Sequence, residues 1–206
     1  MKYIKWKSLL ITCLVCLTPI LLGIALWNQL PDSIAIHFNI YNEADNFASK
    51  EFAVFGLPAM MVLLQIICCV INDVNTYRFG ERKKFTRATK WIIPILCIVL
   101  QILTLGYSLG WNIDIRRAVQ IILGVIFLTI GNYLPKFDRV RSIKGKEMAH
   151  EKARKVNRFI GKETVLLGIL SFICAFLPTI ASIIWLILLI PYALVAIWYG
   201  VKVSKE

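Results

Sequence analysis

The chain has 206 residues, 58% of them hydrophobic, and a mean hydropathy of +0.70. Soluble globular domains are about 45–50% apolar, and six apolar segments with their connections use almost the whole sequence, so no separate soluble domain remains. The formal net charge of +12 lies mostly beside those segments. This placement predicts a bilayer with anionic headgroups as the partner and argues against direct nucleic-acid binding.

The six apolar segments predict an all-α integral membrane protein with six transmembrane helices. A helix needs about 20 residues to cross a hydrocarbon core of about 30 Å. The first segment has the basic start of a signal peptide, but its apolar run is too long and no small-residue cleavage site follows, which predicts a retained helix. The fifth is the shortest, so its helix is either short or begins within the preceding basic residues. The segments cover residues 8–27, 52–72, 91–109, 118–134, 163–178 and 180–200.

Basic residues fall almost entirely on one side of these segments. With a cytoplasmic amino terminus, 21 of the 24 Lys and Arg residues lie in cytoplasmic pieces, and Lys50, Arg116 and Arg117 remain outside. Cytoplasmic loops of membrane proteins carry this excess of basic residues. The sequence therefore predicts a multi-pass protein of the cell membrane with both termini cytoplasmic.

The connection at residues 28–51, between the first two helices, is predicted to be a small folded extracellular cap. Ile34, Ile36 and Phe38 alternate with small or polar residues, which is typical of a short strand. Asn42 lies in a turn-like stretch and tolerates a positive φ better than most residues. Four carboxylates against one lysine give this connection a net charge of −3.

The two longer cytoplasmic connections are basic. Residues 73–90 contain an Arg82-Lys83-Lys84 cluster, and residues 135–162 form the longest basic stretch. Between residues 142 and 159, apolar side chains recur at helical spacing among lysines and arginines. This pattern predicts an amphipathic helix that lies on the inner leaflet.

His37, Glu43 and Asp45 of the cap are the candidates for a metal site or an acid–base set. No second histidine is near enough to complete a usual zinc set, so the favoured interpretation is a hydrogen-bonded, structural His37 with no bound metal or cofactor. The sequence carries no hydrolase, kinase or P-loop motif. The chain is therefore predicted not to be an enzyme.

Polar residues inside the apolar segments leave a second class of function open. Gln65, Gln101 and Gln120 would line a polar path in a small transporter or lipid-handling protein. No Asp, Glu, Lys or Arg lies in the middle of a segment, which argues against a proton-driven pump. The six cysteines all fall within apolar segments and are interpreted as packing residues rather than as a metal or redox site.

Eight residues of the cap, the first motif, follow a recurring spacing: Pro31, His37, Phe38, Asn39, Glu43, Asp45, Phe47 and Lys50. They resemble a short extracellular module of unknown function with the pattern P-x-H-(W/F)-(N/D)-x-x-G-x-x-D-x-(W/F)-x-x-K. The chain has Ala35 where the pattern has a proline and Asn42 where it has a glycine. This module often precedes the SdpI family, the immunity proteins against the sporulation-delaying-protein toxin and related peptides.

A second motif lies in the later half of the chain: Gly131, Asn132, Pro135, Lys136, Asn157, Arg158 and Gly161. It resembles the I-G-N-x-x-P-K and N-R-x-x-G elements of the SdpI domain, although residues 141–146 do not carry the G-I-R-x-P-W-T-L run found between them. Asn132 is expected to hydrogen-bond a neighbouring helix or to cap local backbone at the end of a span.

The resemblance implies a bacterial membrane immunity or resistance protein that protects against an antimicrobial peptide toxin, which the cap would meet outside. It also implies capture of a small transcriptional repressor at the inner face, where residues 82–84 and 154–158 would be the docking surface. The implied organisation is residues 1–27 for the amino-terminal segment and first span, 28–51 for the cap, 52–117 for spans two and three, and 118–206 for an SdpI-like domain with spans four to six.

Overall fold

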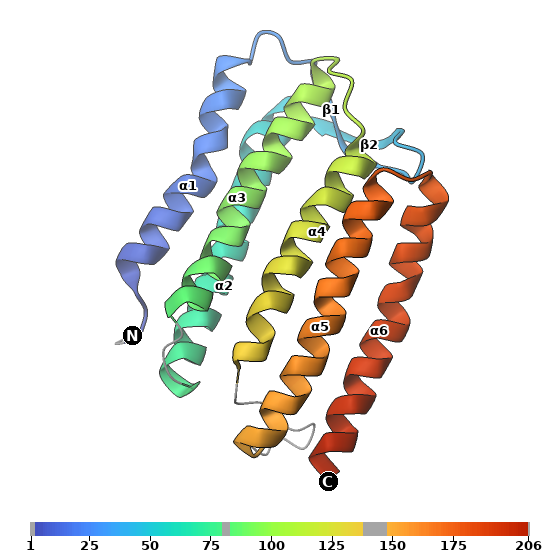
Figure 1. Cartoon of the computed structure of the whole chain (residues 1–206). Helices are drawn as coiled ribbons and strands as arrows, with labels where there is room; N and C mark the ends of the chain where they lie inside the picture. The colour runs from blue at the N-terminus through green and yellow to red at the C-terminus, as the bar shows by residue number, and fades with distance from the viewer. Residues whose placement is uncertain (1–2, 80–82, 138–147, 206) are drawn as a thin grey trace. The chain divides into compact units, whose positions relative to one another are not determined.

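The computed structural model describes residues 3–79, 83–137 and 148–205, with side chains for all of these except 78, 79, 83 and 84. This part of the chain folds into two compact units, Met1–Ile115 and Arg116–Glu206. Figure 1 shows the helices and strands in chain order. They are α1 Trp6–Ala25, β1 Ser33–Phe38, β2 Ala44–Ser49, the π-helix η1 Phe52–Gly56, α2 Leu57–Phe79, α3 Lys83–Ser108, α4 Ile115–Tyr133, the 3₁₀-helix η2 Leu134–Lys136, α5 His150–Ala175 and α6 Thr179–Lys205.

Five helical stretches within the described residues are long and apolar enough to cross a membrane, which supports the predicted membrane class. They are Trp6–Ala25, Phe52–Tyr77, Phe85–Ser108, Ile115–Lys136 and Thr179–Lys205. Helix α5 is not among them, and its amino-terminal half carries five Lys and Arg residues. The cap adds a two-stranded antiparallel sheet to this helical architecture.

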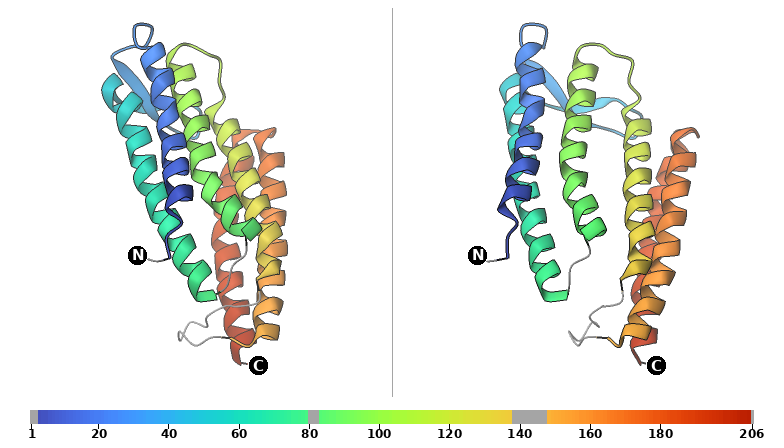
Figure 2. Two further views of the ribbon diagram at one scale, coloured as in Figure 1. Left: turned by 90° about the vertical axis from the view of Figure 1, so that its left-hand side faces the viewer. Right: turned by 60° about the vertical axis from the view of Figure 1, so that its left-hand side comes forward.

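In the first unit, α1, α2 and α3 run side by side, and the strands lie at the end away from the amino terminus (Figure 2). Gly23 of α1 allows this packing, because a Cβ atom there would lie 2.5 Å from a methyl carbon of Val54. Helix α3 ends in a Schellman motif. Gly110 has φ +82°, and the N–H of Trp111 donates to the carbonyl of Gly106 at 3.0 Å.

The predicted cytoplasmic loop at residues 73–90 is mostly helix, so this boundary prediction was wrong. Helix α2 continues to Phe79 and α3 begins at Lys83, and the side chains of Asp73 and Lys90 are buried. The polar residues in this stretch pair with one another across the two helices, so they do not mark a loop. Of the predicted Arg82-Lys83-Lys84 cluster, Arg82 and the side chains of Lys83 and Lys84 lie outside the described residues.

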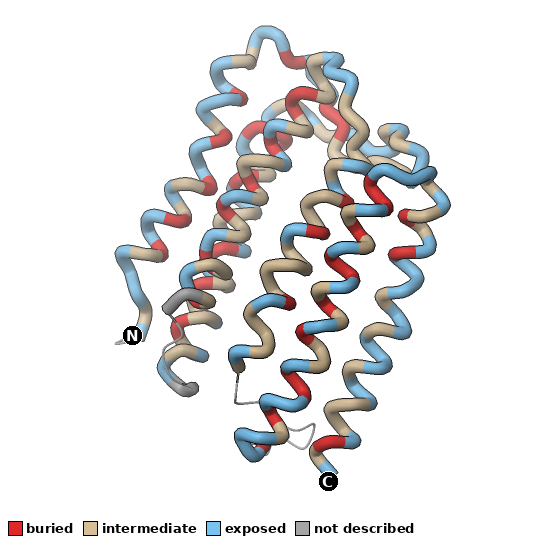
Figure 3. The backbone as a smooth tube through the Cα atoms, in the orientation of Figure 1, coloured by how far each residue is buried: buried red, intermediate tan, exposed pale blue. Residues whose placement is uncertain are grey.

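In the second unit, the basic stretch before the fifth span is not a separate surface helix as predicted. Residues 142–147 of that expectation lie outside the described part, and residues 150–159 are the first turns of α5, which continues without a break to Ala175. The other interpretation, that the fifth helix begins within the basic stretch, is confirmed. Figure 3 shows α6 exposed over most of its length, as expected for a helix that faces lipid.

Candidate functional site

The cap is a hairpin whose turn depends on Asn39 and Asn42. The side-chain oxygen of Asn39 accepts hydrogen bonds from the N–H groups of Tyr41 (2.9 Å) and Glu43 (3.0 Å). Asn42 has φ +66°, which confirms the predicted positive φ at the position where the related pattern has glycine. The first motif therefore specifies the turn geometry.

Asn42 also ties the turn to the chain segment after α3. Its amide nitrogen donates to the carbonyl of Ile113 at 3.2 Å, and its amide oxygen accepts from the N–H of Ile115 at 2.7 Å. A glycine at this position would supply the backbone conformation without these two hydrogen bonds. The substitution in the pattern thus adds a contact that the sequence alone does not reveal.

An apolar cluster anchors the hairpin to the helices of the first unit. Leu30 and Ile34, with exposed fractions of 4% and 0%, pack with Ala53, Val54 and Leu105. The ring of Phe38, a residue of the first motif, meets Tyr107 of α3 edge to face at 4.6 Å between ring centres. An isolated hairpin is marginally stable in water, so this packing keeps the cap folded.

Lys50, the last residue of the first motif, closes the base of the hairpin. Its side chain is 13% exposed and lies 3.1 Å from a carboxylate oxygen of Asp32. It also donates to the carbonyl of Leu30 at 3.2 Å and lies over the ring of Trp27. Lys50 is therefore a structural residue that joins the two ends of the cap.

The remaining charged residues of the first motif lie on the solvent-exposed side. The Nδ1 atom of His37 is 2.5 Å from an oxygen of Asp45, and both side chains are exposed. Glu43 accepts a hydrogen bond from the side-chain amide of Asn39 at 2.8 Å and is not part of this pair. Within the described residues, no group of three or more His, Cys, Asp or Glu side chains is arranged to hold a metal ion.

The cap also exposes large apolar side chains. Ile40, Tyr41 and Phe47 have exposed fractions of 44%, 69% and 53%. They lie in the turn and second strand, together with the carboxylates of Glu43 and Asp45. We call these five residues the cap surface. It combines negative charge with exposed apolar area, which fits a cationic amphipathic ligand. Pro31, also in the first motif, is exposed at the base of the hairpin.

The glycines of the second motif allow α4 and α5 to approach each other closely. A Cβ atom at Gly131 would lie 2.9 Å from the carbonyl oxygen of Gly161, and one at Gly161 would lie 2.7 Å from the ring of Pro135. Asn157 is buried, and its amide donates to the carbonyl of Phe137 at 2.8 Å. These four residues fix the connection between the two helices.

The other residues of the second motif lie on its outside. Asn132 is exposed, and its side chain makes no hydrogen bond within the described part of the chain, unlike the expected contact with a neighbouring helix. Lys136 is exposed, with its ammonium group 4.5 Å from the ring centre of Tyr133. Arg158 is exposed on α5. The motif thus divides into a packing set and an exposed set.

A second glycine pair extends this contact by about two helical turns. The sequence analysis did not identify it. A Cβ atom at Gly124 would lie 3.1 Å from the carbonyl oxygen of Gly168, and one at Gly168 would lie 2.9 Å from the backbone nitrogen of Leu128. Small residues at helix contacts let backbones approach closely in membrane proteins. The signal in the sequence is the spacing of seven residues between the glycines on each helix.

Arg116 and Arg117 bind the other end of this helix pair. Arg116 donates to the carbonyl of Leu177 at 3.3 Å and to the hydroxyl of Ser182 at 2.9 Å. Arg117 donates to the carbonyl of Ala175, the last residue of α5, at 3.2 Å. Cations at a helix carboxyl end satisfy its open carbonyls and interact favourably with the helix dipole.

The first unit contains a buried ion pair that sequence analysis assigned to a loop. Lys90 of α3 donates to Asp73 of α2 at 2.7 Å, and their side chains are 3% and 0% exposed. The other carboxylate oxygen of Asp73 accepts from the backbone N–H of Lys5 at 3.0 Å. The pair therefore joins the start of α1, the end of α2 and the start of α3.

The three glutamines predicted as a polar path each bind a nearby group in the protein. Gln65 donates to the carbonyl of Lys90 at 2.9 Å, and Gln101 donates to the carbonyl of Ala53 at 3.0 Å. Gln120 belongs to the other unit and accepts from the hydroxyl of Ser171 at 2.6 Å. Their hydrogen bonds join neighbouring helices within each unit.

Long apolar helices, interhelical glycine contacts and buried polar cross-links define a multi-pass membrane protein with a small hairpin domain. The family model for a domain of unknown function, DUF1648, matches residues 14–62, which include the hairpin and the helical segments on either side of it. The immunity protein SdpI of Bacillus subtilis (strain 168) is 26% identical over 192 residues, with 91% of this chain and 89% of the relative covered. No solved structure matches the chain. The two matches support the chain as an SdpI-family membrane protein, as the two motifs predicted.

Proposed function

We propose that this protein is a bacterial membrane immunity protein that protects its own cell membrane from an antimicrobial peptide toxin. The observation that carries the proposal is the similarity to an immunity protein over 91% of the chain, together with the hairpin domain in the expected place. In this proposal the cap meets the toxin outside the cell, and the helices hold it or shield its target.

The proposed orientation places the cap outside and both termini in the cytoplasm. Lys50, Arg116 and Arg117, the three basic residues on the outer side, all bind groups within their own unit. The remaining 21 Lys and Arg residues would face the cytoplasm. The bound state of the three outer cations supports the orientation, because it explains why they are tolerated on that side.

The proposal includes six crossings, which the contacts between α4 and α5 support. Helix α4 belongs to a stretch with the length and composition of a span. Arg117 near its start contacts Ala175, and Gly131 near its end contacts Gly161. Residues 161–175 of α5 therefore lie along residues 117–131 of α4, which supports a crossing by α5 beside that of α4.

The cap surface is the proposed toxin contact. Its exposed aromatic and aliphatic side chains would bind the apolar face of the peptide, while Glu43 and Asp45 attract basic residues. The net charge of −3 over residues 28–51 acts at short range, because the Debye length is about 8 Å at physiological ionic strength. Binding would therefore depend on direct contact more than on long-range steering.

Protection is tested by expressing the chain in a toxin-sensitive strain and titrating toxin-type peptides. We expect the chain to raise the peptide concentration needed for killing, and the double variant Asp45→Asn, Phe47→Ala to lose most of that increase. The control, Glu151→Gln with Ile197→Ala, also removes one carboxylate and one exposed apolar side chain, but away from the cap. The proposal would be refuted if the wild-type chain left the killing concentration unchanged for every relevant peptide.

A second proposed role is capture of a small transcriptional repressor at the cytoplasmic face. The exposed arginines at residues 154–158 of α5 supply a basic docking surface. Arg82 and the side chains of Lys83 and Lys84 lie outside the described part. The test is a fluorescent fusion of a small repressor encoded beside the toxin genes. It should move to the membrane when toxin is added to wild-type cells. It should stay in the cytoplasm with Arg154→Gln, Arg158→Gln, while protection against the toxin persists.

The alternative function, a small transporter or lipid-handling protein, requires the glutamines to form a path. Their hydrogen bonds within the two units favour a structural role instead. Flux assays in proteoliposomes decide between the two. Substrate-dependent flux that is lost in Gln101→Leu would favour transport over immunity.

A further inference from the structure

A series of side chains on α5 changes from cationic to apolar along the helix. Arg154, Arg158 and Lys162 follow each other at intervals of four residues, and Leu166 and Leu170 continue the same series. Residues four apart lie on the same face of a helix. Each step of four residues also turns by about 40° around the helix axis, since there are 3.6 residues per turn. The series therefore winds around α5 as a spiral stripe that presents three positive charges and then aliphatic side chains, with the change between residues 162 and 166.

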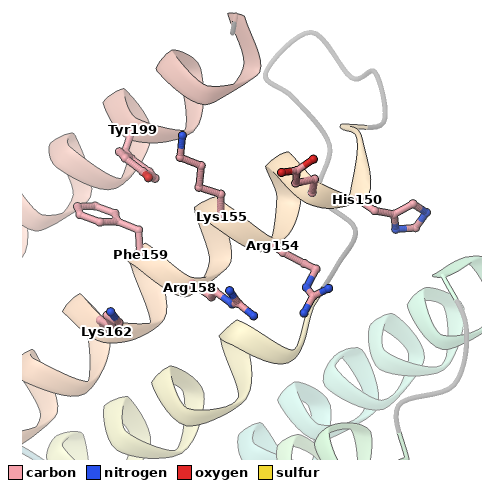
Figure 4. A pocket seen from close by; sticks show the side chains of 8 residues that line it. His150, Arg154, Lys155, Arg158, Phe159, Lys162 and Tyr199 are labelled. Carbon is pink, nitrogen blue, oxygen red and sulfur yellow. The ribbon is translucent and has the colours of Figure 1, made fainter.

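The cationic part of this stripe lines a cavity of about 740 Å³ along the start of α5, to which α6 contributes Tyr199. Its walls include Arg154, Arg158 and Lys162 of α5 and the stacked rings of Phe159 and Tyr199, whose centres are 4.1 Å apart. Figure 4 shows these rings side by side, with the two arginines extending from successive turns of α5. Charge and aromatic surface are thus combined in one hollow.

An apolar groove of about 240 Å³ continues from the same place. Phe159 lines both the cavity and the groove. The groove contains one carboxylate, Glu163, and then follows Leu166 and Leu170 of α5 and Leu188 and Ala196 of α6. From residue 162 to residue 170 the helix rises about 12 Å. The groove is therefore long enough to hold the first part of an acyl chain.

The charges of the cavity are not balanced from within. Among the described residues, no carboxylate lies within ion-pair distance of Arg154, Arg158 or Lys162, and Glu151 is the acidic residue in the cavity wall. Guanidinium groups bind phosphate oxygens in bidentate geometry. The arrangement therefore has the chemistry of a phosphate site.

We propose that the α5–α6 groove is a binding site for one anionic phospholipid. The phosphate binds Arg154, Arg158 and Lys162, and one acyl chain lies along the apolar groove beside Leu166 and Leu170. Basic pockets between helices at the cytoplasmic side of membrane proteins bind anionic headgroups in this way. This site is independent of the proposed protection against a toxin, because it lies on α5 and α6 and not on the cap. It shares Arg154 and Arg158 with the proposed repressor-docking surface, but only the lipid site also uses the apolar groove.

A phospholipid would occupy both the cationic cavity and the apolar groove, whereas the other candidate ligands would occupy only the cationic cavity. A free phosphate ion would use the cations and leave the apolar groove unfilled. An acidic protein segment would also use the cations, but it has no reason to occupy a groove that follows a membrane-facing helix pair. A lipid carries the phosphate and the acyl chain at the spacing that the stripe provides.

The test is native mass spectrometry of the purified full-length protein titrated with phosphatidylglycerol and, separately, with phosphatidylcholine. We expect one tightly retained phosphatidylglycerol and no equivalent phosphatidylcholine. Arg154→Gln, Arg158→Gln, Lys162→Gln should weaken the retained phosphatidylglycerol about 100-fold, since each cation near an anionic headgroup contributes on the order of a fivefold effect. The control Lys7→Gln, Arg87→Gln, Lys205→Gln removes the same amount of charge from exposed positions on other helices. This control variant should still retain phosphatidylglycerol.

Two further measurements separate the two halves of the site. Ala196→Trp fills the apolar groove and should weaken phosphatidylglycerol while leaving the cations in place, and inorganic phosphate at the same concentration should not displace the lipid. Thermal unfolding of each variant verifies that it is folded. Equal loss in the control triple variant, equal retention of both lipids, or displacement by inorganic phosphate would each overturn the proposal. The proposal would also be overturned if Ala196→Trp retained phosphatidylglycerol as well as the wild-type protein does.

Discussion

The two units pack their helices by different means. In the first unit, buried polar groups connect α1, α2 and α3, as in the ion pair of Asp73 and Lys90 and the hydrogen bond from Gln101 to the carbonyl of Ala53. In the second unit, α4 and α5 meet mainly through glycines, with Gly131 against Gly161 and Gly124 against Gly168, beside a buried hydrogen bond from Ser171 to Gln120. Lipid tails are as apolar as leucine, so the hydrophobic effect does not drive helices together within a bilayer. The two units show two other sources of attraction between helices: buried polar contacts and close backbone packing at glycines.

The difference predicts different sensitivities to substitution. A polar cross-link depends on the presence of both partners, because one left alone is a buried unpaired group. A glycine contact depends on the absence of a side chain, because any added atom separates the backbones. The first unit should therefore be damaged by deleting atoms, and the second by adding them.

Removing one partner of the buried ion pair should have the largest effect. Asp73→Ala leaves the buried ammonium of Lys90 without a counter-charge, and we expect a loss of about 3–5 kcal/mol in the free energy of unfolding. Unfolding in mixed detergent micelles measures it. The double variant Asp73→Leu, Lys90→Met should recover most of the loss, because it removes both charges together. A double variant as unstable as the single one would show that the charges themselves are needed.

Adding a side chain at the glycine contact should have the next largest effect. Gly161→Leu places atoms against the ring of Pro135 and the backbone of Gly131, so we expect a loss of about 1–3 kcal/mol. The matched control is Gly200→Leu, since no atom lies within 4 Å of a Cβ there. Thermal unfolding of both proteins compares them, and similar melting temperatures would contradict the close contact of α4 and α5.

The turn of the cap offers a smaller and local test within the first unit. Asn42→Gly keeps the positive φ but loses two side-chain hydrogen bonds, whereas Asn42→Ala also strains the backbone. We expect about 1 and 2 kcal/mol of local destabilisation, or roughly 5-fold and 30-fold faster amide exchange around residues 39–43. Equal exchange in the two variants would mean that φ does not matter at this turn.

The exposed pair of His37 and Asp45 should give the smallest effect on stability. Asp45→Asn keeps the size of the side chain and an oxygen that can accept from His37, so we expect a change within about 0.5 kcal/mol. The same unfolding experiment measures it at neutral pH. A loss in the free energy of unfolding comparable to that of Asp73→Ala would mean that Asp45 is needed for folding. Its carboxylate would then not be free to bind a ligand.

Much of this architecture was predictable from the sequence because length, hydrophobicity and turn chemistry are local properties. The apolar segments gave the helices, the alternation around Ile36 gave a strand, and asparagine at residue 42 gave a positive φ. The first and second motifs also pointed to the SdpI resemblance that the comparisons support. In each case the residues that determine the structure lie near one another in the chain.

The errors concern residues whose partners are distant in the chain. Asp73 and Lys90 were assigned to a loop because each is polar, and their burial depends on pairing across 17 residues. The start of α5 was separated from its span because basic residues interrupt the apolar pattern. Gly124 and Gly168 lie outside the related motifs, and their role follows from backbone distances between two helices. A search for repeated glycine spacing on neighbouring spans would have found them.

The short apolar stretch of α5 has a consequence for the surrounding membrane. After Glu163, its last charged residue, the helix has 12 residues to its end at Ala175, which is about 18 Å at 1.5 Å per residue. An undisturbed hydrocarbon layer is about 30 Å thick. Hydrophobic mismatch of this size is relieved when the leaflet thins locally and flanking lysines snorkel toward water. In the proposed six-span arrangement, the lipid leaflet beside α5 would therefore be locally thinner.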